Sequence, residues 1–180
     1  MKRFRILLVI LSSLVLTVLP AGCIGPKTVF PDAGLEAAVR EALNKQGPIS
    51  TSDLEALTTL EASNWGIQDL TGLEHCVNLE MLVLAGNNIS DISALAGLTN
   101  LQQLHLAQNN ISDISSLADL TNLQKLYLND NNISDISSLV ENSGLSAGDT
   151  VNLGGDPLND PSINDYIPQL EARGVNVVYL

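Results

Sequence analysis

The chain has 180 residues, a length typical of a single domain, and 45% of them are hydrophobic while only 3% are aromatic. Charged residues make up only 16% of the chain and the mean hydropathy is positive, so the composition excludes an intrinsically disordered protein. With eight Lys and Arg against 20 Asp and Glu, the net charge is −12, which excludes the basic surface of a nucleic-acid-binding protein.

The N-terminus has the pattern of an export signal. An uncharged run over residues 6–19 follows three basic residues, Lys2, Arg3 and Arg5. The run is shorter than the ~20 residues that a membrane-spanning helix needs, and it fits the hydrophobic region of a signal peptide. We therefore predict a signal peptide over residues 1–22.

The sequence "AGC" at residues 21–23 resembles the lipobox of bacterial lipoproteins, although Pro20 stands where that motif usually has Leu, Val or Ile. The resemblance implies a lipid on Cys23, a tether that reaches residue 29, and an exported protein at the bacterial cell membrane or outer surface. An ordinary cleaved signal peptide and a retained anchor are the alternatives. Removal of residues 1–22 leaves five basic and 20 acidic side chains, a charge of about −15, so lipid and not charge would hold the protein at a membrane.

Residues 30–56 predict a helical N-terminal cap. The first helix starts at Asp32, which has the position of an N-cap, and Gly47-Pro48 is predicted to end it. Ser50 and Asp53 have the spacing of a capping box, which begins a second short helix. One face of the first helix is apolar at helical spacing: Leu35, Val39, Ala42 and Leu43. We expect the two helices to cover the hydrophobic edge of the strand that follows.

Residues 57–158 contain a 22-residue repeat. The sequence "NNISDIS" occurs at 87–93, 109–115 and 131–137, and a degenerate unit at 151–158 is offset by 25 residues. The shared pattern LxxLxLxxNxIxxIxxLxxLxx resembles the leucine-rich repeat. One unit cannot bury its own leucines, so the units must stack. The resemblance implies an α/β fold, a right-handed solenoid of four to five repeats with parallel strands on the concave face and short 3-10 or irregular segments on the convex face.

The repeated asparagines have a structural explanation. The chain bends after each strand, and an Asn side chain offers both donors and an acceptor to the backbone groups that lose their partners there. The resemblance implies a ladder of stacked side chains, Asn87, Asn109 and Asn131. Trp65 and Asp156 take the same position in the first and last units, so we expect the ladder to start and stop at these residues.

An aspartate recurs four positions after the ladder position: Asp69, Asp91, Asp113 and Asp135. Two interpretations apply, a column of metal-binding carboxylates or a cap on the following helical turn. A one-sided row of carboxylates about 5 Å apart lacks the cage of oxygens that calcium requires. We therefore interpret these residues as caps and predict no metal site.

Residues 159–180 predict a C-terminal cap formed by a helix and a strand. Ile163, Ile167 and Leu170 form an apolar stripe, and Gly174 fits the position after a helix end. Pro168 is expected to weaken the helix before it. The sequence "VNVVYL" would add a last strand to the sheet. The helical N-terminal cap joined to such repeats resembles bacterial internalin-like proteins.

The candidate reactive residues do not converge on one site. His75 aligns with loop residues and is predicted at the surface, whereas Cys76 fills a leucine position and is predicted to be a buried, inert thiol without a disulfide partner. His105 points out of the sheet, and no nucleophile or orienting carboxylate lies beside it in the pattern. The sequence contains no phosphate-binding loop, zinc spacing or hydrolase motif, and we predict neither catalytic residues nor a cofactor.

Residues that flank the strand leucines would form columns across the concave face, and we predict that this face binds a protein or peptide partner. Tyr127 and His105 are expected about 5 Å apart on neighbouring strands. The predicted binding residues are Met81, Val83, Gln103, His105, Gln108, Lys125, Tyr127 and Asp130. The resemblance implies a monomeric, non-enzymatic binding module, anchored as a lipoprotein. A structural envelope protein without a discrete ligand is the main alternative, and an enzyme that depends on His105 is the second.

Overall fold

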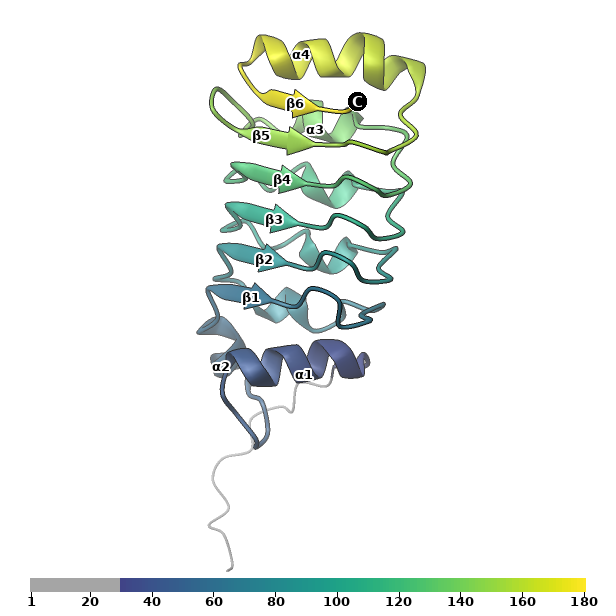
Figure 1. The fold of residues 1–180 in the computed structure, drawn as a ribbon. Coiled ribbons are helices and arrows are strands. Elements are labelled where there is room, and N and C mark those ends of the chain that lie inside the picture. Colours follow the sequence, from purple (N-terminus) through teal and green to yellow (C-terminus); the bar gives the residue numbers. More distant parts are fainter. Residues whose placement is uncertain (1–29) are drawn as a thin grey trace, which may run out of the picture.

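Each repeat places one short strand beside the strand of the previous repeat (Figure 1). The computed structural model describes residues 30–180, so the predicted signal peptide, Cys23 and the tether lie outside the described residues. Six strands form one sheet in chain order, and every neighbouring pair is parallel. The strands are β1 (Thr59–Glu61), β2 (Met81–Val83), β3 (Gln103–His105), β4 (Lys125–Tyr127), β5 (Thr150–Asn152) and β6 (Asn176–Val178).

The strand register follows the sequence repeat. Leu82, at the centre of β2, pairs with Leu60 of β1 and Leu104 of β3, its counterparts 22 positions away. The step from Leu126 of β4 to Val151 of β5 is 25 positions, as the offset of the last unit predicts. Because side chains alternate along a strand, these central residues enter the core while the two residues beside each of them face outward.

The return segments lie across the core from the sheet. Three of them are 3-10 helices, as predicted: η1 (Leu73–His75), η2 (Ser93–Leu95) and η3 (Ser115–Leu117). The fourth unit is three residues longer and forms a short α-helix, α3 (Ser137–Glu141). The core between the two layers is aliphatic. The inward residues of the third unit are at most 2% exposed: Leu101, Leu104, Leu106, Ile111, Ile114, Leu117 and Leu120.

Two helices cover the β1 end of the stack. α1 (Ala33–Ala42) packs against β1 and begins after Asp32, whose Oδ1 accepts the backbone N–H of Leu35 at 2.9 Å. The predicted end of α1 is wrong. The helix stops at Ala42, before Gly47-Pro48, because Asn44 adopts a left-handed φ of 48°.

The second helix of this cap, α2 (Thr51–Glu55), has the predicted capping box. The backbone N–H of Ser50 donates to Asp53 Oδ2 at 2.7 Å, and the backbone N–H of Asp53 donates to Ser50 Oγ at 3.4 Å. Both ends of the box are therefore paired, which fixes the point where the chain enters the first repeat.

The other end of the stack has the predicted helix and strand, with one difference. A π-helical segment, η4 (Ser162–Tyr166), continues into α4 (Ile167–Ala172) and then β6. Ile167 and Leu170 are buried, but Ile163 is 38% exposed, so its assignment to the apolar stripe is wrong. The wider π-helical turn rotates Ile163 away from the core. Pro168 is the second residue after η4, and because it has no N–H it cannot donate to a carbonyl oxygen of the π-helical turn before it.

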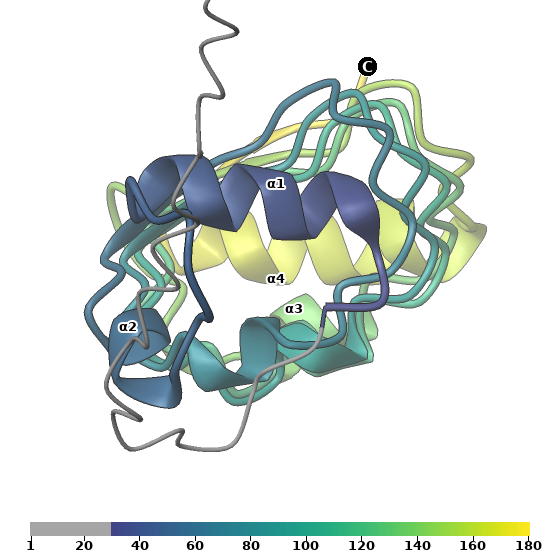
Figure 2. The same ribbon diagram turned by 90° about the horizontal axis from the view of Figure 1, so that it is seen from below.

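The two ends of the stack are closed by helices. Figure 2 looks along the stack from the α1 end, with α1 in front and α4 at the far end. α4 packs against β6, and Gly174, at a φ of 87°, ends the helix as predicted. Within residues 30–180, none of the helices combines the length and the apolar character that crossing a membrane requires.

Candidate functional site

The asparagine ladder holds the strands of the candidate binding face in place, and its prediction is confirmed. Asn109 Oδ1 accepts the backbone N–H of Ile89 at 3.0 Å. Its Nδ2 donates to the carbonyl oxygens of Leu84 and Leu106, both at 3.0 Å. One buried amide thus links two consecutive repeats, and Asn87 and Asn131 make the equivalent bonds.

The two ends of the ladder differ from its middle. The backbone N–H of Trp65 donates to Asn87 Oδ1 at 3.0 Å, so the first unit takes part through its main chain. Asp156 Oδ1 accepts the backbone N–H groups of Asn131 and Ile133, at 3.2 and 3.1 Å. Asp156 Oδ2 stands in the place of the amide nitrogen and is buried without a partner. Burial, together with the charge of Asp130, raises the pKa of Asp156 to about 6.

A second asparagine ladder runs along another edge of the repeats, and sequence reasoning missed it. Its members are exposed, and each donates through Nδ2 to a main-chain oxygen 23 residues earlier in the chain. The bonds join Asn78 to Glu55, Asn100 to Val77 and Asn122 to Thr99, at 2.8, 2.9 and 2.7 Å. The available signal was an Asn at the last position of three successive 22-residue units.

The recurring aspartates lie before the return helices but are not their N-caps, which are Ile92, Ile114 and Ile136 in η2, η3 and α3 and have no side-chain capping bond. In each unit Oδ1 accepts the backbone N–H two residues later, at 2.8 Å: Asp69 from Thr71, Asp91 from Ser93, Asp113 from Ser115 and Asp135 from Ser137. These bonds hold the pKa of Asp91 and of Asp113 below its usual range. Within residues 30–180, no group of three or more His, Cys, Asp or Glu side chains is placed to hold a metal ion.

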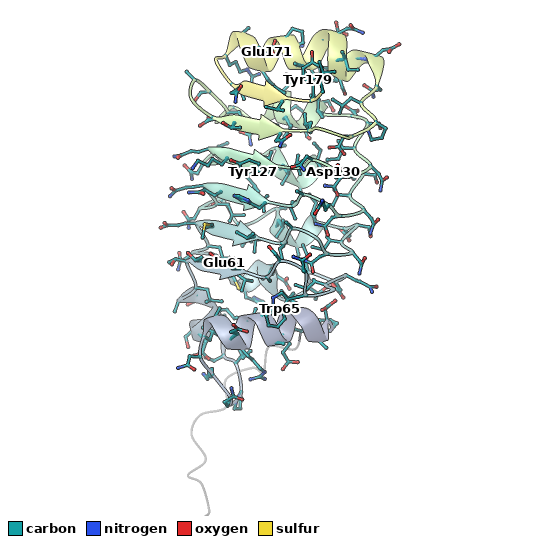
Figure 3. All side chains as sticks on the ribbon, in the orientation of Figure 1. Glu61, Trp65, Tyr127, Asp130, Glu171 and Tyr179 are labelled. Carbon is teal, nitrogen blue, oxygen red and sulfur yellow. The ribbon has the colours of Figure 1, made fainter. Side chains whose placement is uncertain are left out.

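Six of the eight predicted binding residues lie together on three neighbouring strands. In register, Met81, Gln103 and Lys125 form one column, and a parallel column joins the last residues of the same strands, Val83, His105 and Tyr127. We call this group, with the outward residues of the other strands, the sheet face. Figure 3 shows Tyr127 of β4 and Glu61 of β1 on the same side of the stack.

The other two predicted residues, Gln108 and Asp130, lie beyond the strand ends, at left-handed φ values of 57° and 59°. They belong to a column of left-handed positions that sequence reasoning missed: Asn64, Gly86, Gln108, Asp130 and Gly155. A Cβ on Gly86 would lie 2.3 Å from Asn64 Oδ1, so the side chain of one unit takes the space above the glycine of the next. This column therefore shapes the chain's turn out of the sheet and borders the sheet face.

His105 and Tyr127 form an aromatic pair at the centre of the sheet face, as predicted. Their ring centroids are 4.3 Å apart and the rings are tilted by 39°. Partial burial, with a smaller contribution from the charge of Lys125, lowers the pKa of His105 below its ordinary value of 6.5. The imidazole is therefore neutral at neutral pH, and the pair presents an uncharged aromatic surface.

The remaining reactive side chains are placed as predicted. His75 is exposed in the η1 turn, and Cys76 is fully buried in its leucine position. Burial, and to a lesser extent the charge of Glu74, raises the pKa of the Cys76 thiol to about 12. Such a thiol stays protonated and unreactive at neutral pH.

Comparison with known proteins identifies the repeats. Two family models match, "Leucine Rich repeats (2 copies)" over residues 99–141 and "Leucine rich repeat" over residues 67–111. No curated protein matches the chain. An internalin from Listeria monocytogenes, InlF, has a similar structure with a TM-score of 0.70 and 29% identity, over 91% of this chain and 54% of the internalin.

The functional domain of InlJ, from the same organism, gives a TM-score of 0.59 over 75% of this chain and 39% of that one, and at 24% identity this likeness concerns the fold alone. The present chain spans about half the length of InlF. The fold is a leucine-rich repeat solenoid of the kind seen in these internalins, and together the matches support a bacterial leucine-rich repeat protein.

Proposed function

We propose that this protein is a non-enzymatic protein-binding module whose ligand binds on the sheet face. The observation that carries the proposal is the distribution of charge. The chain has 20 acidic residues, yet the twelve outward strand positions hold only two charged side chains, Glu61 and Lys125. Centres of protein interfaces are likewise depleted of charge and enriched in aromatic residues and Met.

The framework around the sheet face supports the same proposal. The inward residues and the ladder asparagines are nearly the same in each unit, whereas the outward positions differ from strand to strand. A rigid scaffold that presents varied side chains is suited to recognition, because little conformational entropy is lost when a partner binds. Leucine-rich repeat proteins of the internalin type generally mediate protein binding, which agrees with this assignment.

The proposal includes attachment to the bacterial envelope. A lipid on Cys23 would hold the monomeric domain at the membrane through the tether at residues 24–29. The test is the Cys23→Ser variant: it should leave the membrane fraction and appear in the soluble fraction, and it should no longer incorporate a labelled fatty acid. Equal labelling of the two proteins would refute lipid attachment at Cys23.

A photo-crosslinking residue placed at one position of each surface tests the binding face. Gln103 lies in the middle of the sheet face, and Ser112 is exposed outside the strand, in the segment that leads to η3 of the same repeat. On intact cells, crosslinking from position 103 should capture a defined partner that position 112 does not capture. The double change His105→Ala and Tyr127→Ala should lower that yield about tenfold, as expected for the loss of an aromatic anchor.

The same experiment separates the alternatives. Identical products from positions 103 and 112 would show that the sheet face is not the binding surface. An absence of products from both positions would favour a structural envelope protein without a discrete ligand. The enzyme alternative would need a turnover that His105→Ala abolishes.

A further inference from the structure

One basic side chain of the described residues is left without a partner, and it lies on the sheet face. Lys125, on β4, is exposed and no acceptor lies within bonding distance of its ammonium group among residues 30–180. The other three cations in that range are engaged: Arg40 with Glu36, Lys45 with Asp53, and Arg173 with the carbonyl oxygens of Val140 and Asn142.

The β1 end of the sheet face is acidic and contains a depression. Glu61 of β1 and Glu41 of α1 border an open depression of ≈ 310 Å³ between the helix and the strand. Its other lining residues are small: Ala38, Ala42 and Thr59. Neither carboxylate has an ion-pair partner among the described residues. The depression can therefore admit a basic side chain, and two carboxylates would face its charge.

An uncharged stretch separates the acidic depression from Lys125. β1 and β4 are three strand steps apart and Glu61 and Lys125 lie in different outward columns, so the two residues are about 16 Å apart. The stretch between them consists of Met81 and Val83 on β2 and Gln103 and His105 on β3, and the imidazole is neutral at neutral pH. The part of the sheet face between α1 and β4 therefore has a direction, because it is acidic beside α1 and basic at Lys125.

We propose that the sheet face binds an extended segment of a partner protein that crosses the strands, with a basic side chain in the α1–β1 depression and an acidic side chain on Lys125. An extended chain advances about 3.3 Å per residue, so the two charged residues of the partner stand four to five positions apart, with apolar residues between them. The two outward columns are about 7 Å apart. An α-helix with its side chains is wider than this, which favours an extended segment as the ligand. This inference rests on the proposed function, since it assigns the chemistry of the ligand to the same face.

Synthetic peptides provide the probe. Labelled twelve-residue peptides carry one Arg and one Glu, separated by two to eight positions on a background of Val, Leu and Tyr, in both orders of charge. Binding to the purified full-length protein is measured by fluorescence anisotropy at low salt. Peptides with the charges four or five positions apart should bind best, because only these reach both the α1–β1 depression and Lys125.

Charge reversal identifies the contacts. Lys125→Glu should weaken binding of the best peptide at least about fivefold, and replacing the peptide's Glu with Lys should restore it. Glu61→Lys should weaken binding similarly, whereas Glu141→Lys, the same change at an exposed position of α3, should not. Circular dichroism verifies that each variant is folded.

Two outcomes would overturn this inference. The first is a binding strength that does not depend on the spacing of the peptide charges or on the sign of residue 125. The second is that none of the peptides binds. If crosslinking from position 103 still captures a partner in either case, the proposed function stands and only the assigned ligand chemistry is wrong. If both experiments are negative, the proposed function fails as well.

Discussion

The backbone N–H of Asn131 donates to Asp156 Oδ1 at 3.2 Å, so the buried asparagine ladder ends on a carboxylate. Asp156 Oδ1 accepts hydrogen bonds as the amide oxygen of a ladder asparagine does, but Asp156 has no amide nitrogen to donate. In the preceding rung the amide nitrogen of Asn131 donates to two carbonyl oxygens, whereas Asp156 Oδ2 is buried and unpaired. The last rung is therefore the weakest one when its carboxyl group is ionised.

Replacing Asp156 with Asn should stabilise the protein by about 1–2 kcal/mol at pH 7.5. This is less than the full pKa shift of Asp156 implies, because the side chain is partly solvated. The folded-state pKa of about 6 exceeds the ordinary 3.8, so the folded protein binds the extra proton. The destabilising effect of Asp156 is thus absent below about pH 4, grows between pH 4 and 6, and is complete above pH 6. Urea unfolding of both proteins at pH 4 and 7.5 measures the difference.

Asp160→Asn removes a nearby exposed carboxylate and serves as the control for the change in net charge. It should leave the unfolding midpoint almost unchanged at both pH values. A gain in stability for Asp156→Asn that is the same at pH 4 and 7.5 would contradict the assignment of the pH dependence to this side chain.

Removing the ladder side chain of Asn109 should destabilise the protein far more than removing the exposed side chain of Asn110, the next residue in the sequence. Asn109→Ala leaves the N–H of Ile89 and the carbonyls of Leu84 and Leu106 without this partner, and we expect a loss of about 2–4 kcal/mol. Asn110→Ala changes the same residue type one position later, where the side chain is exposed, and should cost less than about 0.5 kcal/mol. Chemical unfolding followed by far-ultraviolet circular dichroism compares the two, and equal losses would show that the ladder is not a main source of stability.

Two glycines should respond differently to the same substitution. A Cβ on Gly144 would lie 1.9 Å from the carbonyl oxygen of Thr121, so Gly144→Ala must displace the main chain and should cost at least about 3 kcal/mol. A Cβ on Gly97 would meet no atom within 4 Å, and Gly97→Ala should change stability by less than about 0.5 kcal/mol. Thermal unfolding measures both, and a Gly144→Ala protein as stable as the wild type would contradict the close approach at Thr121.

The thiol of Cys76 should react with a labelling reagent only when the protein unfolds. Because it is fully buried and its pKa is raised to about 12, it should not react with a disulfide reagent at pH 8 in the folded protein. Full labelling should appear across the same urea concentrations as the loss of secondary structure. Rapid labelling without denaturant would show that the first repeat opens locally.

Most of the fold could be predicted from the 22-residue repeat. A leucine at each strand centre, the 22-residue step and the 25-residue step before Val151 specify the strand register, because a shift by one residue would turn the buried set toward solvent. The end of α1 at Ala42 was not predicted, since Gly47-Pro48 is the stronger local stop signal and the left-handed Asn44 gives a weaker one. Ile163 was misplaced because a π-helical turn has no distinct sequence pattern.

The candidate site could be predicted only in part. The column that contains His105 and Tyr127 follows from the alignment of the repeats, and so does the contact between these two rings. The depression beside Glu61 was not predictable, because α1 lies outside the repeat and its position over β1 depends on tertiary packing. Likewise, the isolation of Lys125 depends on where the other cations find their partners.

The strands from β1 to β4 are equally spaced, so the number of repeats between Glu61 and Lys125 sets the distance between these two charges. Glu61 and Lys125 lie on either side of the two units at residues 79–122, which are nearly identical in their inward residues. Duplication of one such unit would leave the inward residues at each junction unchanged and would move the two charges apart by one strand spacing, about 4.8 Å. The length of ligand that the sheet face accommodates can therefore change in evolution by duplication of the DNA that encodes one repeat, while the buried residues stay the same.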